Sequence, residues 1–459
     1  MKTIFITIFE GVESKNILRT DIIKTIMKEE DVRVVLFFKN ESRRDYHRAE
    51  FEEGERMFFE VVPALPVRGL DAIFMHLKFT LLRTGTTKFL RELALDDRRN
   101  YPMYYIGLVA NRILARPFFI KIFRFLDLNF IGGVTFCPFF EKYKPDLVFM
   151  ANLFDEHECT MLRESLRRGI KTVGFINSWD RASARCVLRL VPDTLIVFND
   201  AIKKTIIAHH DIPDEKIFIG GIPQCDYHFQ APYISREEFY KKAHIDLTKK
   251  IIVYSPLGNQ YSDDDWNMLD CIGRLNDEGK FGKNIAILVR IPPNDYVDER
   301  EIAKRPQFAY DYPGKRFSLK KGTDWDMTFE ELRYLSDTLY YMSLIICYAS
   351  SISVDAAVFD KPVININFLI RKNVKLSRSP TLYYGKEHYK EALSTGGIRL
   401  VQNVEELITS VNEYLNDPSV DSAARARLAK GQCFFQDGKS GERIGKYVVG
   451  FLLGNAQRA

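Results

Sequence analysis

Short apolar segments alternate with longer amphipathic segments along the first half of the chain. Several of the short segments are apolar at nearly every position, as in the run VRVVLFF at 32–38. Strands of this kind are covered on both faces, which is typical of a parallel sheet between two layers of helices. The predicted strands of this half are 3–9, 32–38, 57–62, 146–151, 171–176, 194–198 and 216–219, and the predicted helices between them are 16–29, 157–168 and 200–209. This order predicts a doubly wound α/β domain.

A second series of the same kind follows the polar stretch 230–249. Its predicted strands are 250–255, 284–290, 343–348, 362–366 and 398–401, and its predicted helices are 264–276, 329–340, 351–359 and 403–415. The last segment, 438–455, has an amphipathic pattern and is predicted to be a helix. We therefore expect a first domain over 1–235, a second domain over 245–437, and a C-terminal helix in 438–459 that packs back toward the first domain.

The segment 65–130 breaks this alternation, because it contains no clear strand and is dense in Phe, Tyr, Leu and Arg. It is predicted to be a helical insertion in the first domain. Within 101–130 the basic residues are Arg112, Arg116, Lys121 and Arg124, and the single acidic residue is Asp127. Two interpretations stay open. The helices lie on an anionic membrane or bind a lipid-linked substrate, or they pack on their own domain and extend their arginines to water.

Composition excludes several classes of protein. Hydrophobic residues make up 46% of the 459 residues and charged residues 28%, which is typical of a globular enzyme and not of a disordered or collagen-like chain. The net charge of +5 is too small to indicate a nucleic-acid-binding protein. The seven cysteines form no CxxC pair, so neither a zinc site nor a disulfide framework is predicted. With no signal-peptide pattern and no apolar run of about 18 residues, we expect a cytoplasmic chain.

The window 330–368 contains the most informative pattern. A predicted strand ends at Tyr348 and is followed by small residues, including Ser350 and Ser351, and then by a helix that contains Asp355. The backbone amides at the start of such a helix suit a phosphate, and Asp355 is placed to accept hydrogen bonds from ribose hydroxyls. The alternative is an ordinary capping motif in which the carboxylate of Asp355 interacts favourably with the helix N-terminus.

This pattern resembles the donor-binding element of GT-B nucleotide-sugar transferases. It is most similar to the branch that contains CDP-glycerol glycerophosphotransferases and bacterial surface-polysaccharide transferases. Further windows that resemble this branch, in the same order, are SWD at 178–180, GGIPQCDY at 220–227, IVYSP at 252–256, ILVRIPPND at 287–295 and DGKSGER at 437–443. The resemblance extends from about residue 170 to about residue 450.

The resemblance implies a GT-B fold, with two doubly wound Rossmann-like domains that face a cleft. It also implies metal-independent transfer of a sugar or a polyol phosphate, by a glycosyltransferase or glycerophosphotransferase, from a nucleotide donor to a surface-glycan or lipid-linked acceptor. No resident cofactor or metal is expected. The acidic run at 263–265 precedes a helical pattern, so we interpret it as a helix start and not as a metal site. With such an acceptor, we expect the chain to lie peripherally at the inner face of a membrane and to contact it through 101–130.

The resemblance assigns the donor to the second domain. The residues that we assign to donor binding are Tyr254, Ser255, Arg290, Ser350, Ser351, Asp355 and Lys439, and positive charge from Arg290 would offset the leaving phosphate. One motif departs from the family, because Pro292 stands where the family has a histidine that is thought to help hold the donor phosphate. His388 and Lys386 are our candidates for its replacement, and the alternative for His388 is a histidine in a surface loop.

The base that takes the proton of the acceptor hydroxyl is expected in the first domain. In open α/β sheets ligands bind at the carboxyl ends of the strands. Asp155 and His157 follow the predicted strand 146–151, and Asp180 follows 171–176. We predict that Asp155 or Asp180 is the base, with His157 as the third candidate.

Each of these acids also has a structural interpretation. Asp155 suits the N-cap of the helix predicted at 157–168, and Asp180 suits an ion pair with Arg181 or Arg185. Glu10 and Glu13 follow the first predicted strand, where they either bind acceptor hydroxyls or are simply exposed to solvent.

Two other functions fit the same fold. A sugar-nucleotide 2-epimerase would abstract a proton from one substrate and would not need the long aromatic insertion. A non-catalytic nucleotide-binding or scaffold protein would explain Pro292. Turnover of a sugar nucleotide alone would favour the first, and nucleotide binding without turnover would favour the second.

Overall fold

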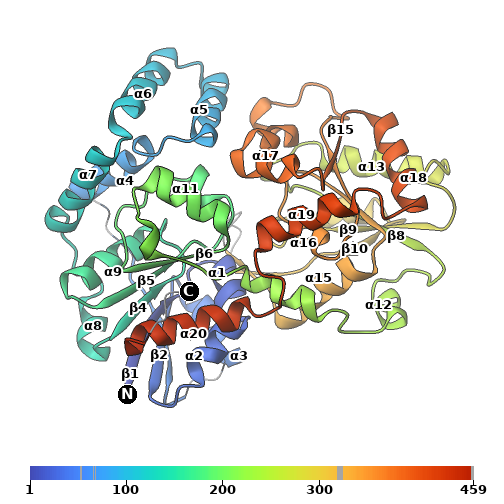
Figure 1. Ribbon diagram of the computed structural model, residues 1–459. Coiled ribbons are helices and arrows are strands. Elements are labelled where there is room, and N and C mark those ends of the chain that lie inside the picture. The colour runs from blue at the N-terminus through green and yellow to red at the C-terminus, as the bar shows by residue number, and fades with distance from the viewer. Residues whose placement is uncertain (52–53, 66, 68, 318–323, 456–459) are drawn as a thin grey trace. The chain divides into compact units, whose positions relative to one another are not determined.

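The computed structural model of the protein describes residues 1–51, 54–65, 67, 69–317 and 324–455. The chain forms two compact units, each built around one parallel sheet that is covered by helices (Figure 1). The first unit consists of Met1–Asp226 and Cys433–Ala459, and the second consists of Tyr227–Gln432. In sequence, the second unit is therefore an insertion into the first.

The sheet of the first unit has seven strands in the order β3-β2-β1-β4-β5-β6-β7, and all its pairs are parallel. The strands are β1 (Lys2–Thr7), β2 (Val32–Phe38), β3 (Met57–Val61), β4 (Leu147–Met150), β5 (Lys171–Phe175), β6 (Thr194–Val197) and β7 (Ile217–Ile219). At the centre, Ile4 of β1 lies opposite Val34 of β2 and Leu147 of β4. These side chains are completely buried, as expected for strands covered on both faces.

Short and medium helices cover this sheet. They are α1 (Gly11–Glu13), the π-helix η1 (Ser14–Leu18), α2 (Asp21–Met27), α3 (Glu41–Phe51), α8 (Cys137–Tyr143), α9 (Glu156–Arg167), α10 (Arg181–Ala184), α11 (Asp200–His210) and α20 (Ser440–Leu453). The helix predicted over 16–29 is wrong in one respect, because η1 and α2 are separate elements. Thr20 begins the second of them by accepting a hydrogen bond from the backbone N–H of Ile22, at 3.4 Å.

The C-terminal helix α20 packs directly on α2 near the N-terminus of the chain (Figure 1). Two glycines of α20 permit this close approach. A Cβ atom at Gly441 would lie 2.9 Å from the backbone nitrogen of Asp21, and one at Gly445 would lie 2.6 Å from the Cβ of Thr25. Asp226 caps α20 by accepting hydrogen bonds from the backbone N–H groups of Ser440 (3.0 Å) and Gly441 (2.7 Å). The sequence windows 220–227 and 437–443 therefore meet in the first unit.

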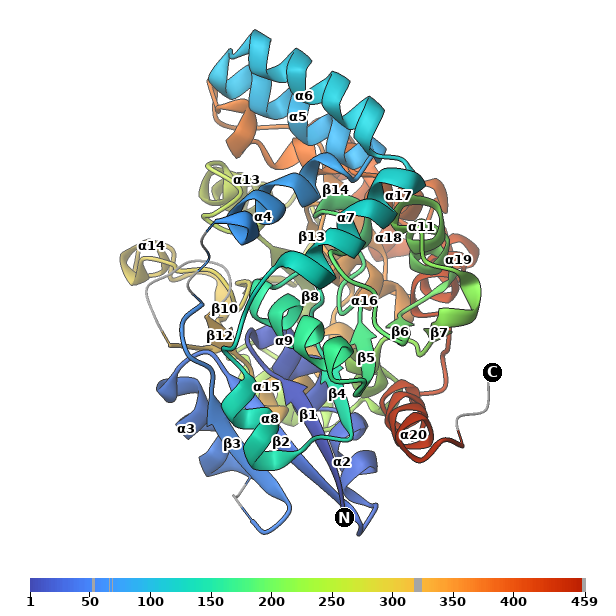
Figure 2. The same ribbon diagram turned by 90° about the vertical axis from the view of Figure 1, so that its left-hand side faces the viewer.

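The insertion predicted at 65–130 is helical. It contains α4 (Leu70–Thr80), α5 (Gly85–Arg98), α6 (Tyr101–Leu114) and α7 (Pro117–Phe130), which we call the arm. Figure 2 shows α5 and α6 running side by side as a hairpin. The arm is attached to its unit by buried charges: Asp127 of α7 accepts hydrogen bonds from Arg163 of α9 (2.9 Å) and from Arg189 (2.7 Å). Arg189 also binds Asp71 of α4, at 2.7 Å.

The second unit contains a six-stranded parallel sheet in the order β10-β9-β8-β13-β14-β15. Its strands are β8 (Lys250–Ser255), β9 (Ile285–Arg290), β10 (Ala309–Asp311), β13 (Leu344–Cys347), β14 (Val363–Ile366) and β15 (Arg399–Val401), and a separate antiparallel pair is formed by β11 (Lys315–Arg316) and β12 (Trp325–Asp326). The helices are α12 (Arg236–Lys242), α13 (Asp265–Asp277), α14 (Glu299–Ala303), α15 (Phe329–Tyr341), α16 (Ile352–Val358), α17 (Glu387–Ser394), α18 (Val404–Asn416) and α19 (Ser422–Cys433).

The predicted fold class is confirmed by these elements: two doubly wound parallel α/β units, a helical insertion in the first, and a closing C-terminal helix. The sequence pattern did not predict the strands β10, β11 and β12 or the helices α3, α8, α10, α12, α14, α17 and α19. No helix among the described residues combines the length and the apolar character needed to span a bilayer.

Candidate functional site

Two buried glutamates lie beyond the carboxyl ends of β1 and β4. Glu13 of α1 is completely buried, and its Oε2 accepts hydrogen bonds from the backbone N–H groups of Phe9 and Glu10. Its Oε1 has no hydrogen-bond partner among the described residues. Burial, and next the charge of Glu10, raise the pKa of Glu13 to about 7. The interpretation of Glu13 as a solvent-exposed residue is therefore wrong.

Glu158 of α9 occupies the same edge of the sheet. Its carboxylate accepts hydrogen bonds from Thr7 Oγ1 of β1 (2.6 Å) and from the backbone N–H of Asn152 (2.7 Å). Burial, and next the charge of Glu13, raise the pKa of Glu158 well above its usual range. The two glutamates thus favour bound protons at a pH where exposed glutamates are ionised.

Asp155 and His157 form a pair at the start of α9. Asp155 is the N-cap of α9, where it accepts a hydrogen bond from the backbone N–H of His157 at 2.8 Å. Its carboxylate also lies 2.5 Å from the ammonium group of Lys39 and 3.3 Å from Nδ1 of His157. Although burial acts in the opposite direction, the hydrogen bonds from His157 and the charge of Lys39 hold the pKa of Asp155 well below its usual range. Asp155 is therefore ionised and the imidazole of His157 is oriented by it.

Asp180 and Arg181 follow β5. The carboxylate of Asp180 accepts a hydrogen bond from Ser178 Oγ at 2.6 Å, and Arg181 forms an ion pair with Glu10 at 2.9 Å. Charges from Glu10, Glu13 and Asp180 all act on the guanidinium of Arg181. The structure thus brings the candidate Asp180 to the same edge as Glu10 and Glu13. We call the set Glu10, Glu13, Asp155 and Glu158 the acidic edge.

Three residues of this region were not identified from the sequence: Lys39, Glu158 and Asn177. Asn177 is buried after β5, and neither atom of its side-chain amide has a hydrogen-bond partner among the described residues. Lys39 directly follows a strand, and Glu158 stands one residue after His157. Their positions after strands could therefore have identified them from the sequence. Their burial and pairing depend on residues more than 100 positions away in the sequence.

In the second unit, Arg290 ends β9 and is almost completely buried. Its guanidinium forms an ion pair with Asp311 at the end of the neighbouring strand β10. Burial lowers the pKa of Arg290 to about 10, and the charges of Tyr334, Glu331 and Asp355 act against that change. Arg290 therefore remains a cation at neutral pH, and the structure brings it near Asp355.

Asp355 of α16 pairs with a histidine that the sequence reasoning missed. Nε2 of His228 lies 3.3 Å from Asp355 Oδ1, and its Nδ1 lies 2.8 Å from Ser336 Oγ of α15. Both His228 and Asp355 are buried. His228 comes two residues after the window that ends in Asp226, so its place next to a motif was the only sequence signal.

The serines assigned to donor binding differ in their surroundings. Ser351 is exposed at the N-cap of α16 and Ser350 is half-buried, and within the described part of the chain neither hydroxyl forms a hydrogen bond. Ser255 is buried, and its hydroxyl donates to the backbone oxygen of Arg290 at 3.4 Å. Tyr254 is completely buried, and its hydroxyl donates to the backbone oxygen of Asp265 at 3.0 Å. Tyr254 therefore lies in the core of the sheet.

The two remaining donor candidates are His388 and Lys439. His388 is a half-buried residue at the start of α17. Lys439 is exposed at the N-cap of α20 and belongs to the first unit, whereas the other donor candidates belong to the second. The acidic run at 263–265 begins α13, as predicted, and Asp264 accepts hydrogen bonds from the backbone N–H groups of Ile370 (2.7 Å) and Arg371 (2.8 Å).

Solved structures with the same fold include enzymes of nucleotide-sugar metabolism. UDP-GlcNAc 2-epimerase from Neisseria meningitidis bound to UDP-GlcNAc has a TM-score of 0.55 at 12% identity, over 99% of this chain and 100% of that one. MnaA from S. aureus in a co-structure with UDP has a TM-score of 0.53 at 12% identity, over 99% and 98%. A glycosyltransferase from Rickettsia africae has a TM-score of 0.50 at 12% identity, over 98% of both chains. At such identities the similarity is one of fold, and the fold is GT-B.

Sequence comparison adds the family. No protein of curated function matches the sequence. The family model described as CDP-Glycerol:Poly(glycerophosphate) glycerophosphotransferase matches residues 180–450, which is more than half of the chain. This range contains both Arg290 and the Asp355–His228 pair, and it reaches back to Asp180 at the edge of the first sheet. The chain therefore belongs to the CDP-glycerol:poly(glycerophosphate) glycerophosphotransferase family.

Proposed function

We propose that the protein transfers a polyol phosphate or a sugar from a nucleotide-activated donor to a hydroxyl of a glycan or a lipid-linked acceptor. The observation that carries the proposal is the pair of His157 and ionised Asp155 at the carboxyl edge of the first sheet, where ligands of open α/β sheets bind. The family and the buried cation Arg290 in the second unit support it.

The proposed reaction is a substitution at the donor. The acceptor oxygen forms a bond to the phosphorus of a polyol phosphate, or to the anomeric carbon of a sugar. The bond from that centre to the leaving oxygen breaks, and the nucleotide departs with the electron pair. A base takes the proton of the acceptor hydroxyl. The protein must therefore supply a proton acceptor and must offset the negative charge of the leaving phosphate.

We assign the base to His157, with Asp155 as the residue that orients it. Asp155 is itself a poor proton acceptor, because its pKa is well below the usual range. A carboxylate that binds one nitrogen of an imidazole fixes the ring and stabilises the imidazolium that forms when the other nitrogen accepts a proton. His157 Nδ1 faces Asp155, so Nε2 is the nitrogen that accepts the proton. Asp180 is the alternative base.

The donor is assigned to the second unit. Arg290 offsets the charge of the leaving phosphate, and Asp355 accepts hydrogen bonds from the ribose hydroxyls. The hydroxyls of Ser350 and Ser351 form no hydrogen bond within the described residues, which leaves them for the donor. Ser255, His388 and Lys439 are further donor candidates. Bound metal and cofactor are not part of this proposal.

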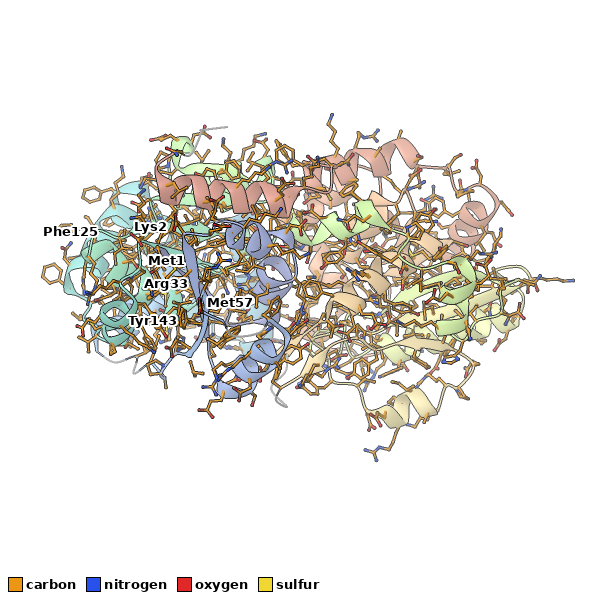
Figure 3. All side chains as sticks on the ribbon, turned by 90° about the horizontal axis from the view of Figure 1, so that it is seen from below. Met1, Lys2, Arg33, Met57, Phe125 and Tyr143 are labelled. Carbon is orange, nitrogen blue, oxygen red and sulfur yellow. The ribbon has the colours of Figure 1, made fainter. Side chains whose placement is uncertain are left out.

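The arm is proposed to touch the membrane. Its inner face packs on its own unit, as Ile120 and Phe123 of α7 are buried. The outer face is apolar and exposed: Phe118, Phe125 and Phe130 of the same helix are each more than 60% exposed, and Figure 3 shows Phe125 at the outer edge of the first unit. Helices with this division of faces and with nearby Arg and Lys lie in the interface of anionic bilayers. At that interface the arm would contact a lipid-linked acceptor.

The test is an assay of nucleotide release from CDP-glycerol and from UDP-linked and CDP-linked sugars, with and without a lipid-linked acceptor. We expect acceptor-dependent release with one donor, and a loss of about 10²–10⁴-fold in kcat for His157→Ala. His76→Ala, which changes an exposed histidine of α4, is the matched control. Full activity of His157→Ala would exclude it as the base, and absence of turnover with every donor and acceptor would count against a transferase.

Epimerisation of a sugar nucleotide is the second candidate, and the fold shared with UDP-GlcNAc 2-epimerases favours it. The same assay separates the two functions. An epimerase converts the sugar nucleotide to its isomer without an acceptor, whereas a transferase releases nucleotide only when the acceptor is present. A scaffold protein would bind nucleotide and do neither.

A further inference from the structure

The hairpin of α5 and α6 contains a groove of about 260 Å³. One side of the groove is formed by Arg91, Leu95 and Arg98 of α5, which are four and three residues apart and therefore share one face of the helix. Met103 and Tyr104 of α6 line the other side. The groove thus combines apolar walls with two guanidinium groups, and none of its residues takes part in the proposed transfer reaction.

Small residues create this space. Ala94 of α5 and Gly107 of α6 both line the groove, where larger side chains would normally fill a helix–helix contact. Glycine inside a helix costs about 1 kcal/mol relative to alanine. Close packing does not require it here, because a Cβ atom at position 107 would meet no other atom within 4 Å. The sequence therefore keeps a hollow between the two helices at some cost in helix stability.

Among the described residues, no acidic side chain pairs with the arginines of the groove. Within the described residues neither Arg91 nor Arg98 forms an ion pair, and the single hydrogen bond of Arg91 goes to the backbone oxygen of Phe79 at 3.4 Å. Burial lowers the pKa of Arg91, since one charge is held partly away from water. Planar guanidinium groups bind phosphate through paired hydrogen bonds, and such pairs are strong when partly desolvated.

We propose that this groove binds the phosphate headgroup, and the first methylenes of one chain, of an anionic phospholipid of the membrane. The inference rests on the proposed contact of the arm with a bilayer. Met103 of the groove and Ile106 of the same helix are each 64% exposed, so the bound chain would continue into the apolar phase beside them. The volume is below the ~300–1,000 Å³ of sites that enclose a whole drug-sized ligand. A headgroup with the start of a chain fits such a space, while the rest of the lipid stays in the bilayer.

The first test compares two pairs of arginines on the same arm. Full-length protein is sedimented with phosphatidylcholine vesicles that contain or lack phosphatidylglycerol. Arg91→Ala/Arg98→Ala removes the cations of the groove, and Arg112→Ala/Arg116→Ala removes the same charge from the exposed surface outside it. We expect the groove variant to lose at least tenfold more affinity for the anionic vesicles than the control. Equal losses would overturn the proposal, because general surface charge would then explain binding.

The second test fills the groove without changing its charge. Gly107→Leu places a side chain in the hollow and raises helix propensity, so the hairpin is expected to fold, and circular dichroism checks this. We expect about a tenfold loss of binding to vesicles with phosphatidylglycerol, and no loss for Gly107→Ala. Wild-type binding by folded Gly107→Leu would overturn the proposal. If that variant does not fold, the comparison of the arginine pairs decides alone.

A competition experiment identifies the ligand chemistry. Monomeric dihexanoyl-phosphatidylglycerol should displace the protein from anionic vesicles at concentrations where inorganic phosphate does not. Equal displacement by inorganic phosphate would overturn the proposal in favour of a plain anion site. Vesicle binding needs no donor, so failure of the transfer assay with selective vesicle binding would refute the transferase alone. Transfer to a soluble acceptor combined with unselective vesicle binding would refute the groove alone.

Discussion

The two sheets share the same order of their central strands, but their carboxyl edges contain different side chains. In the first unit the edge gathers Glu10, Glu13, Asp155 and Glu158, of which two are completely buried. In the second unit the corresponding edge contains the buried cation Arg290 and the buried imidazole of His228. Parallel α/β sheets place their loops in the same position regardless of function. The side chains at the two edges, and not the shared fold, therefore assign the base to the first unit and the donor to the second in the proposed reaction.

Both units contain buried polar atoms that have no hydrogen-bond partner among the described residues. In the second unit Oδ1 of Asp265 is such an atom, although His228 bonds to both Asp355 and Ser336. In the first unit one carboxylate oxygen of Glu13 and the amide of Asn177 are buried without a hydrogen-bond partner among the described residues. Most buried polar atoms in native proteins are bonded, so unbonded ones require an explanation. A ligand rich in hydroxyl groups, such as the proposed acceptor, would supply those missing bonds.

The largest effect is expected from Asp155→Asn in the first unit. The amide carries no charge and would neither orient His157 nor stabilise its protonated form, so transfer at saturating donor should fall about 100-fold or more. Nucleotide affinity should stay within twofold of the wild type, because the donor is assigned to the other unit. Initial rates and calorimetric titration measure the two quantities. Asp96→Asn on the exposed surface of α5 is the control, and a parallel loss of nucleotide affinity would break the division between the edges.

The buried acid Glu13 should make stability depend on pH. Its pKa is raised in the folded protein from 4.5 to about 7, so the folded state binds the proton more tightly than the unfolded state. The stabilisation that this proton provides is complete below pH 4.5. It is lost as the pH rises through 7, which lowers the free energy of unfolding by about 2–3 kcal/mol. Glu13→Gln keeps the acceptor for the Phe9 and Glu10 amides and should lose that part of the pH dependence. Urea unfolding at pH 5 and pH 8 measures it, and identical pH dependence in both proteins would contradict the assignment.

Asp355→Ala tests whether the second unit binds the donor. Loss of its charge-assisted hydrogen bonds to the ribose should weaken nucleotide binding by about 1–3 kcal/mol. The transfer rate at saturating donor should change less than in the Asp155→Asn variant. Calorimetric titration with the donor nucleotide is the measurement, and Asp277→Ala at an exposed position of α13 is the control. Unchanged affinity in a folded variant would remove Asp355 from the donor site.

The smallest effect is expected from Tyr254→Phe. The hydroxyl of Tyr254 is buried and donates to the backbone of Asp265, so its removal should cost about 1 kcal/mol of unfolding free energy. Donor affinity should not change, because the side chain lies in the core of the sheet. Denaturant unfolding and nucleotide titration test both statements. A tenfold loss of nucleotide affinity at unchanged stability would return Tyr254 to the donor site.

Much of this fold could be predicted from local sequence, and much of the site could not. The apolar runs at 32–38 and 250–255 are strands β2 and β8 with the same bounds, because strands buried on both faces have an unmistakable composition. Positions at the ends of strands also placed Asp155 and His157 at the sheet edge. The hydrogen bond between Glu158 and Thr7, by contrast, forms only because β1 pairs with β4. His228 and Asp355 likewise come together only in the tertiary structure, so no local sequence pattern predicts their contact.

The packing of α20 on α2 has a consequence for synthesis on the ribosome. The second unit, Tyr227–Gln432, is translated entirely before α20 emerges, so its folding need not wait for any later residue. The first unit begins earlier but keeps α2 without its contact to α20 until Ser440–Leu453 has been made. At about 5–20 residues per second, the interval from Met27 to Leu453 lasts roughly 20–85 s. During it the older half of the protein is the unfinished one, and chaperones that bind exposed apolar surface are expected to act on that half first.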